Sequence, residues 1–157
     1  MSMKLICDQM LARLGRWLRA AGYDTVIVES SREDSEILKQ ALHEKRLLIS
    51  RDRHFLAMPS ASGHLIWLQS NKVQDCAEEL SQKLPINWLH APLTRCLVCN
   101  GVLEQAHEHE KKLVPEDVLK KSSLIWKCPL CLRVYWEGSH AKRILRTLNS
   151  WQLKRFG

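Results

Sequence analysis

The amino-acid sequence predicts an α/β protein in which a parallel sheet flanked by helices is followed by a small cysteine-containing unit and a basic C-terminal helix. Three observations support this fold class. Short apolar runs alternate with segments of helical periodicity over the first 84 residues. The alternation stops after residue 92, where cysteines occur in two pairs. The last 20 residues contain five basic side chains and no acidic one.

Four short strands are expected in the first part, because each of these segments is apolar, largely β-branched or leucine-rich, and bounded by charged or turn-forming residues. In chain order they are Lys4–Cys7, Thr25–Glu29, Leu47–Ile49 and Leu65–Leu68. Strands that alternate with helices usually pair in parallel, since each crossover returns the chain to the same end of the sheet.

Apolar residues recur at helical spacing between these strands. The first helix covers residues 10–21 and closes at Gly22, the second begins after Ser30 or Ser31, and the third covers residues 73–84. The side chains expected to face the core from the first two helices are Met10, Leu11, Leu14, Trp17, Leu18, Ala21, Ile37, Leu38, Ala41 and Leu42. Cys7 in the first strand and Cys76 in the third helix are expected to be core residues.

The 157 residues are expected to form two units. Residues 1–84 carry the alternation, residues 85–92 form a linker that Trp88 anchors, and residues 93–157 carry the cysteine pairs and a helix over Ser139–Phe156. The inward side of that last helix should consist of Ile144, Leu145, Leu148 and Trp151.

Charge is distributed unevenly along the chain. Residues 1–89 hold 12 basic and 11 acidic side chains, whereas residues 90–157 hold 12 and 6. Lys142, Arg143 and Arg146 fall on the outer side of the last helix, and Lys154 and Arg155 extend their charge. Such a basic segment indicates a polyanionic partner, nucleic acid first. The alternative is a solvated surface without a partner.

The composition, with 45% hydrophobic and 26% charged residues, is that of a globular protein and excludes a wholly disordered or collagen-like chain. No apolar run approaches the ~20 residues of a membrane helix. The first residues reach a charge after three apolar side chains, unlike a secretory signal. We therefore expect a cytoplasmic protein without membrane association.

Four cysteines form two Cys-x-x-Cys pairs separated by 28 residues: Cys96, Cys99, Cys128 and Cys131. Each pair can direct two thiolates at one ion, and two pairs supply the four sulfurs of a structural Zn²⁺ site. A site closed by four sulfurs leaves no open coordination position, so this zinc should not be catalytic. The alternative is two redox pairs, but neither pair begins a helix of the α/β part.

Three aspartates are candidates for chemistry at the edge of the parallel sheet. Asp8 follows the first strand, Asp52 follows the third, and Asp34 begins the second helix. Ligands of open parallel sheets bind outside the carboxyl ends of the strands. Carboxylates gathered there favour Mg²⁺ or Mn²⁺, which can hold a phosphate and activate water. The alternatives are helix caps for Asp8 and Asp34 and a local ion pair for Asp52.

A row of arginines accompanies these aspartates. Arg13, Arg16 and Arg19 recur every three residues along one side of the first helix, away from its apolar face. Such a row beside carboxylates suits a phosphate backbone, and it equally suits an ordinary solvated helix face.

Five segments of the sequence carry distinctive motifs: Cys7–Thr25 with its Arg-Trp-Leu-Arg block, Leu47–Arg53, Arg95–Gly101, Cys128–Cys131 and Val134–His140 with its Tyr-Trp-Glu-Gly-Ser-His block. Together they resemble the Mut-seven C-terminal RNase domain, a PIN-like family. The resemblance covers about residues 4–145. It implies a PIN-like α/β domain, a C-terminal zinc ribbon and metal-dependent ribonuclease activity.

The resemblance places Asp8, Asp34 and Asp52 where PIN-like domains carry acidic metal ligands. Two positions depart from the pattern. His54 stands where a fourth acidic residue is usual, and Leu132 stands where zinc ribbons usually carry glycine, which predicts an altered loop geometry. The family block also contains Asp24, which is expected only to shape the turn into the second strand.

The first functional hypothesis is a cytoplasmic ribonuclease that depends on Mg²⁺ or Mn²⁺ held by the three aspartates. Residues expected to contact RNA are Arg13, Arg16, Arg51, Lys142, Arg143 and Arg146. The second is a non-catalytic RNA-binding or ribosome-associated module whose zinc ribbon and basic helix carry the function, which His54 favours. The third is a protein-interaction module built on the ribbon.

Overall fold

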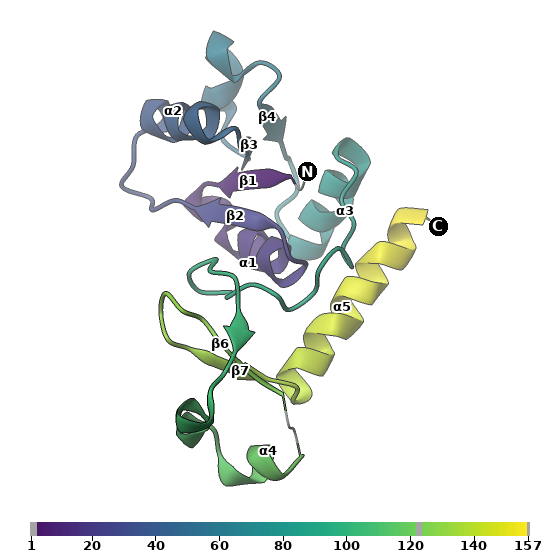
Figure 1. Cartoon of the computed structure of the whole chain (residues 1–157). Helices are drawn as coiled ribbons and strands as arrows, with labels where there is room; N and C mark the ends of the chain where they lie inside the picture. The colour runs from purple at the N-terminus through teal and green to yellow at the C-terminus, as the bar shows by residue number, and fades with distance from the viewer. Residues whose placement is uncertain (1–2, 122–123, 157) are drawn as a thin grey trace.

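The computed structural model describes residues 3–121 and 124–156, and it has the mixed α/β architecture that the sequence predicts. A four-stranded parallel sheet forms the first part of the chain (Figure 1). Its strands are β1 (Lys4–Cys7), β2 (Asp24–Ile27), β3 (Leu47–Ser50) and β4 (Leu65–Trp67). These bounds agree with the predicted strands to within one residue at most ends and two at the end of β2.

The strand order β2-β1-β3-β4 creates a switch point between β1 and β3. The chain leaves β1 toward one side of the sheet to form β2, and it later adds β3 and β4 on the other side. The loops after β1 and β3 therefore diverge at the carboxyl ends of these two strands, which is where open parallel sheets bind their ligands. Asp8 and Asp52 stand in these two loops.

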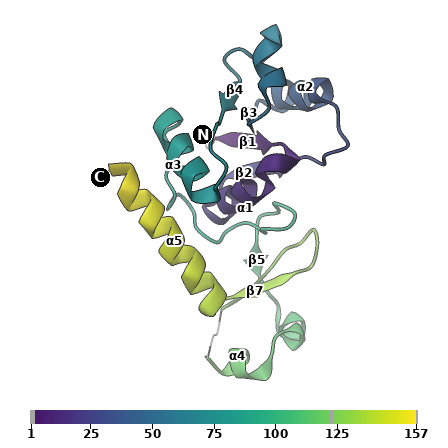
Figure 2. The same cartoon turned by 180° about the vertical axis from the view of Figure 1, so that it is seen from behind.

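Helices cover both faces of this sheet (Figures 1 and 2). α1 (Ala12–Ala20) and α3 (Val73–Lys83) pack on the face that carries Leu5, Cys7 and Ile49. α2 (Asp34–Glu44) packs on the opposite face, together with the 3-10 turns Arg53–Ala57 and Pro59–Ala61. Successive strand residues point to opposite faces, so both sides of the short strands are buried. Cys7 and Cys76 are core residues, as expected.

Two helix starts differ from the sequence prediction. Residues 9–11 form a 3-10 turn before α1 begins at Ala12, and this rotates Met10 outward, leaving it 62% exposed. α2 begins after Glu33, and neither predicted serine caps it with its side chain. Leu42, near the end of α2, is also exposed because the helix turns it away from the sheet. All of these deviations occur near the ends of helices, where tertiary packing decides the geometry.

A three-stranded antiparallel sheet forms the cysteine-containing part, in the order β5-β6-β7. The strands are β5 (Glu104–Gln105), β6 (Ile125–Lys127) and β7 (Val134–Trp136), and the β5–β6 connection carries the 3-10 turn Glu108–Leu113 and α4 (Glu116–Lys121). Its own core is small: Ala106, Val114 and Ile125 are the buried members among the described residues.

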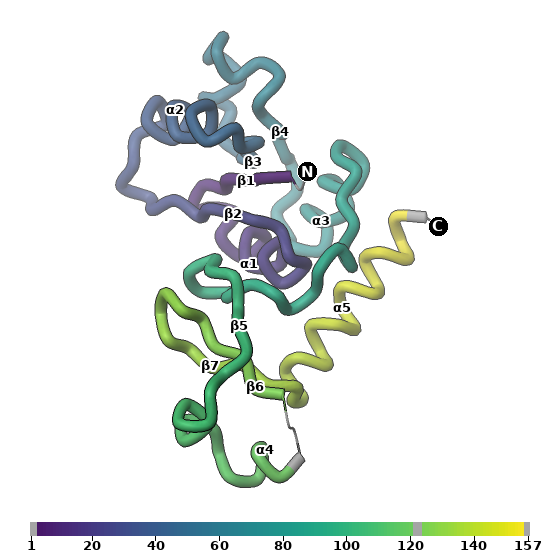
Figure 3. The backbone as a smooth tube through the Cα atoms, viewed as in Figure 1, coloured from purple at the N-terminus to yellow at the C-terminus, as the bar shows by residue number. Residues whose placement is uncertain are grey.

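α5 (Ser139–Phe156) returns from this small sheet to lie along α3 (Figure 3). Leu148 is fully buried there, and the Trp151 ring stands edge-on to the rings of Trp17 and Trp88, with centroid distances of 4.9 and 5.0 Å. Trp88, which was expected to anchor residues 85–92, is also fully buried. Arg155, expected as part of the outer charge, instead donates a hydrogen bond to the Ile86 carbonyl.

The first cysteine loop covers the open edge of the parallel sheet. β2 is an edge strand, and the backbone N–H of Thr25 donates to Asn100 Oδ1 at 3.0 Å instead of to another strand. Arg19 is 6% exposed and donates to the Leu97 and Val98 carbonyls. Arg19 therefore does not belong to a solvated row with its two neighbours on α1. It holds the first cysteine loop against β2.

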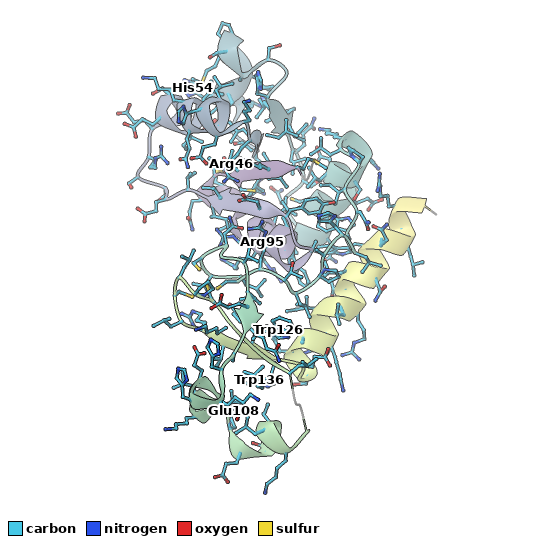
Figure 4. The ribbon with its side chains drawn as sticks, in the orientation of Figure 1. Arg46, His54, Arg95, Glu108, Trp126 and Trp136 are labelled. Carbon is cyan, nitrogen blue, oxygen red and sulfur yellow. The ribbon has the colours of Figure 1, made fainter. Side chains whose placement is uncertain are left out.

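Asp24 and Gly22 complete this contact. Asp24 Oδ1 accepts hydrogen bonds from Arg46 at 2.8 Å and from Asn100 at 2.7 Å, so Asp24 does more than shape a turn. Burial would raise the pKa of Asp24, but these hydrogen bonds outweigh it and lower the pKa. Gly22 has a φ of +101° and accepts a hydrogen bond from Arg95 (Figure 4). A Cβ at Gly22 would lie 2.4 Å from the Ala91 carbonyl oxygen, so only glycine fits.

Candidate functional site

The four paired cysteines meet at one point of the small unit. Their sulfur atoms all lie within 4.8 Å of one another, with Cys96 and Cys131 at 3.6 Å and Cys99 and Cys128 at 3.2 Å. These distances exclude disulfide bonds of about 2.05 Å. They are close to the S···S separation of about 3.8 Å in a tetrahedron with Zn–S bonds of about 2.3 Å. The cluster fits a structural zinc site.

The protonation of this cluster also calls for a cation. Burial opposes ionisation of Cys96, but hydrogen bonds from the Tyr135 hydroxyl and from the Cys99 and Val98 amides outweigh it and lower its pKa to about 6. The pKa of Cys99 is raised to about 12, first by burial and then by the neighbouring sulfurs. The negative charge of one thiolate thus opposes ionisation of the neighbouring thiols. A divalent cation would offset this repulsion and allow the other cysteines to ionise.

The two cysteine loops share one backbone geometry. The residues that follow each pair, Asn100 and Leu132, have positive φ values of 74° and 65°. Each donates its N–H to the carbonyl of the first cysteine of its pair, at 2.9 Å in both loops. The expectation that Leu132 alters the loop was wrong, because this leucine adopts the conformation that glycine would. At Gly101 an added Cβ would lie 2.9 Å from Cys128 Sγ, so a side chain there would displace a ligand.

A buried serine links two of the three candidate aspartates across the switch point. Ser50, the last residue of β3, is fully buried, and its hydroxyl donates to Asp8 Oδ2. The same hydroxyl oxygen accepts the backbone N–H of Asp52 at 3.0 Å. β1 and β3 are adjacent and in parallel register, which sets these residues side by side. The predicted meeting of Asp8 and Asp52 at the sheet edge thus has a structural basis.

Asp8 has an unpartnered buried oxygen. Asp8 is only 8% exposed, and its Oδ1 lacks a hydrogen-bond partner within the part of the chain that the structure describes. Burial raises the pKa of the Asp8 carboxyl, the Ser50 hydrogen bond opposes that rise, and the charge of Asp52 adds to it. An orphaned buried carboxylate oxygen is costly unless a donor or a cation completes it.

Asp34 reaches the same edge through His54. Asp34 Oδ2 lies 2.7 Å from His54 Nδ1, and the backbone N–H of His54 donates to Asp52 Oδ1 at 2.9 Å. The hydrogen bond with Asp34 is the main reason why the pKa of His54 is raised, and the negative charges of Asp34 and Asp52 add to it. The position where a fourth acidic residue was expected therefore holds a histidine that links two of the aspartates, Asp34 through its imidazole and Asp52 through its backbone N–H.

The three aspartates do not converge on a single point as the cysteines do. Within residues 3–121 and 124–156, the cysteine cluster alone brings three or more candidate ligand atoms within 4.8 Å of one another. Asp8, Asp52 and Asp34 instead form a chain of carboxylates connected by Ser50 and His54. Mg²⁺ sites of this open kind take one or two carboxylates, waters and substrate phosphate oxygens.

The candidate arginines at this edge differ in how they are held. Arg51 donates to the Ser70 carbonyl at 3.1 Å, to Asn71 Oδ1 at 3.0 Å and to the Met10 carbonyl at 3.2 Å. Arg51 therefore ties together the loops that surround Asp8. Its positive charge partly opposes the rise that burial causes in the pKa of Asp8. Arg13 and Arg16 on α1 are exposed.

The basic residues of α5 are exposed, as the sequence indicates. Lys142, Arg143 and Arg146 are all exposed, whereas Ile144 and Leu148 of the same helix are buried. No helix in the described ranges combines the length and the apolar character needed to cross a membrane.

Ser50, Arg19, Asn100 and Tyr135 were missed by reasoning from the sequence. Ser50 carried a weak signal, since it is the one hydroxyl in the apolar run before Arg51 and Asp52. The other three act through partners 39 to 79 positions away. A local sequence pattern does not reveal a contact between residues that lie so far apart in the sequence.

The comparisons with known proteins agree with the resemblance seen in the sequence. A family model described as the Mut7-C RNAse domain matches residues 3–148. No curated protein and no solved structure matches the chain. Since the family match spans nearly all of the 157 residues, the chain belongs to the Mut7-C RNAse domain family.

Proposed function

We propose that this protein is a ribonuclease that hydrolyses RNA phosphodiesters with the help of Mg²⁺ or Mn²⁺ at the edge of the parallel sheet. The observation that carries the proposal is the unpartnered, buried Oδ1 of Asp8, one hydroxyl away from Asp52 at the switch point. Membership of an RNase domain family supports the choice of RNA as the substrate.

The residues at the edge fit a hard divalent cation. Asp8 and Asp52 would hold it, because both are carboxylates, Asp8 Oδ1 lacks a protein partner, and the His54 amide uses only one of the two Asp52 oxygens. Asp34 would complete the acidic site through its contact with His54. When bound, such a cation neutralises charge on the phosphoryl oxygens and activates water.

The protein's own groups then have positioning tasks. Ser50 orients Asp8 by donating its hydroxyl hydrogen, and it fixes the start of the following loop by accepting the Asp52 amide. Arg51 holds the surrounding loops and places positive charge beside Asp8. Arg13 and Arg16, exposed on α1, are proposed to contact the phosphate backbone.

The proposal is tested by incubating purified protein with end-labelled single-stranded and hairpin RNA. Cleavage is expected with Mn²⁺ or Mg²⁺ and should stop when EDTA is added, then return with excess Mn²⁺. Zinc bound by four sulfurs should not support cleavage, so the zinc content is measured before and after each treatment. Cleavage that survives EDTA with zinc still bound would contradict the metal dependence.

A second candidate function is RNA binding without cleavage, in a ribosome-associated or other RNA–protein complex. The observation that favours it is His54, because an imidazole replaces a carboxylate at the acidic edge. RNA binding without cleavage under any of the metal conditions would favour this function. In both cases we propose a nuclease-like unit over residues 1–84 and a second unit over residues 93–157, whose cysteine-containing part zinc stabilises, joined by residues 85–92.

We also propose that the protein works in the cytoplasm. All six cysteines, including the buried Cys7 and Cys76, lie outside disulfide bonds, which suits a reducing compartment.

Replacing Lys142, Arg143 and Arg146 together with glutamine should weaken RNA binding several-fold or more. Each phosphate contact on single-stranded RNA contributes about −0.7 to the slope of log affinity against log salt, so the slope should flatten by about two units. Stability should change little because the side chains are exposed. Binding is followed by fluorescence anisotropy over a salt series.

The matched control is a second triple variant that removes three exposed lysines elsewhere, Lys4, Lys39 and Lys120, with the same change in net charge. If both variants lose the same affinity and slope, the effect comes from net charge and not from α5. An unchanged slope for the α5 variant would mean that this helix is merely solvated.

A further inference from the structure

An apolar groove runs between the small antiparallel sheet and the N-terminal end of α5. We call it the ribbon groove and define it by Leu124, Trp126, Tyr135, Trp136, Ala141 and Leu145. Its volume is about 630 Å³, within the ~300–1,000 Å³ of small-molecule sites. Figure 4 shows Trp126 and Trp136 beside the N-terminal end of α5. The groove lies in the zinc-binding part of the chain and is separate from the aspartates at the edge of the parallel sheet.

The pairing of β6 and β7 directs aromatic rings into this groove. Ile125 is buried in the core of the small unit, so its neighbour Trp126 points to the opposite face of the strand. Trp126 pairs across the strands with Tyr135, which therefore lies on the same face. The Tyr135 hydroxyl is bound to Cys96 Sγ, which fixes its ring. The groove thus presents aromatic faces held by the metal-site framework.

Two of these six side chains are exposed to solvent, and the other four are half-buried. Trp126 is 37% exposed and its neighbour Leu124 is 44% exposed. An exposed aromatic groove marks a binding site when other features identify its ligand. Here the positive charge of α5 beside the groove identifies the kind of ligand.

Basic residues stand along the α5 side of the groove. Lys142 and Arg146 do not line the groove themselves, but each directly follows a lining residue, Ala141 and Leu145, and is rotated from it by about 100° toward solvent. Both side chains are exposed, and residues 138–157 contain no acidic residue. Glu137 is the one acidic side chain among the residues that line the groove. A ligand with flat apolar faces and a negative backbone matches this surface.

We infer that the ribbon groove binds an unpaired nucleobase of single-stranded RNA by stacking it on Trp126, while Lys142 and Arg146 contact the adjacent phosphates. The inference rests on the proposal that RNA is the substrate. Stacking on aromatic side chains recognises unpaired bases with little regard to sequence. A base within a duplex is stacked on its neighbours and cannot enter. The groove therefore selects single-stranded segments of RNA. It binds them at a site that is separate from the aspartates proposed to cleave RNA.

The test measures binding and cleavage separately. Binding is measured in EDTA by fluorescence anisotropy with three probes: a 12-nucleotide oligouridine RNA, an abasic oligomer of the same length with the same phosphates, and a 12-base-pair RNA duplex. The proteins are wild type, Trp126→Ala and Trp126→Phe. Leu153→Ala is the matched control, because Leu153 is 75% exposed and does not line the groove. Zinc content and circular dichroism show that each variant keeps its fold.

Trp126→Ala should weaken oligouridine binding about 10-fold, the loss expected for one base stack. It should leave the abasic and duplex probes within 2-fold, and Trp126→Phe should retain most of the affinity. If Trp126→Ala loses zinc, Ala141→Leu, which fills the groove from α5, replaces it and should give the same pattern.

Equal affinities of wild type and Trp126→Ala for oligouridine would overturn the inference. A loss shared by all three probes would also overturn it, because the effect would not depend on the base. These outcomes leave the proposed ribonuclease intact if the wild type cleaves RNA with Mn²⁺. If the wild type binds none of the RNA probes and cleaves none, both proposals fail together, and a protein ligand becomes the remaining occupant.

Discussion

Asp52→Asn should abolish Mn²⁺-dependent RNA cleavage, lowering the rate by about 10³-fold or more. A bound divalent cation contributes several kcal/mol of transition-state stabilisation, and each 1.36 kcal/mol corresponds to about tenfold in rate. The asparagine keeps an oxygen that can accept the His54 amide, now at 2.9 Å from Asp52 Oδ1, so the turn that follows β3 should remain capped. The substitution therefore removes the charge and little of the structure.

The melting temperature of Asp52→Asn should be unchanged or slightly raised. The negative charge of Asp52 is one of the reasons why the pKa of Asp8 is raised, so its removal relieves repulsion between neighbouring carboxylates. Cleavage of end-labelled RNA and thermal unfolding are measured on the same preparation. Asp117→Asn, the same change at an exposed position of α4, is the control and should leave both quantities unaltered. Wild-type cleavage by Asp52→Asn would refute the acidic site.

The sequence was sufficient to predict the parallel sheet and the position of Asp8 and Asp52 at its edge. Both follow from local signals, since apolar strands ended by a charged residue fix where the chain leaves the sheet. Parallel pairing then brings those ends together. The grouping of the four cysteines could be predicted from equally local signals, because two residues between the cysteines of a pair already define the turn.

What the sequence could not supply is the network between distant segments. Ser50 and His54 connect the aspartates only because β1 pairs with β3 and the following turn folds back over α2. Arg19 fits the spacing of an exposed row with Arg13 and Arg16, yet tertiary contact with the first cysteine loop buries it. Periodicity assigns a residue to a helix face, but it does not identify which segment covers that face.

Removing one cysteine ligand should unfold the zinc-binding part of the chain. In Cys128→Ser we expect the zinc to be lost and residues 94–137 to become sensitive to protease. Zinc binding contributes about 10–16 kcal/mol in small structural sites, whereas whole domains are stable by about 5–15 kcal/mol. The apolar core of this part has three buried members among the described residues, Ala106, Val114 and Ile125, and cannot replace the metal.

The parallel sheet and α5 should survive this change. Leu148 and Trp151 anchor α5 on α1 and α3 through contacts that do not involve the four clustered cysteines. Elemental analysis should give one zinc per wild-type chain and none for Cys128→Ser, and limited proteolysis should cut between residues 94 and 137 while residues 3–93 and α5 stay protected and bound to each other. Cys76→Ser is the matched control, since Cys76 is buried but lies outside the cluster, so this variant should keep its zinc. A zinc-free Cys128→Ser protein that still protects residues 94–137 would contradict the coupling of metal binding and folding, because the fold there would then rest on its side chains alone.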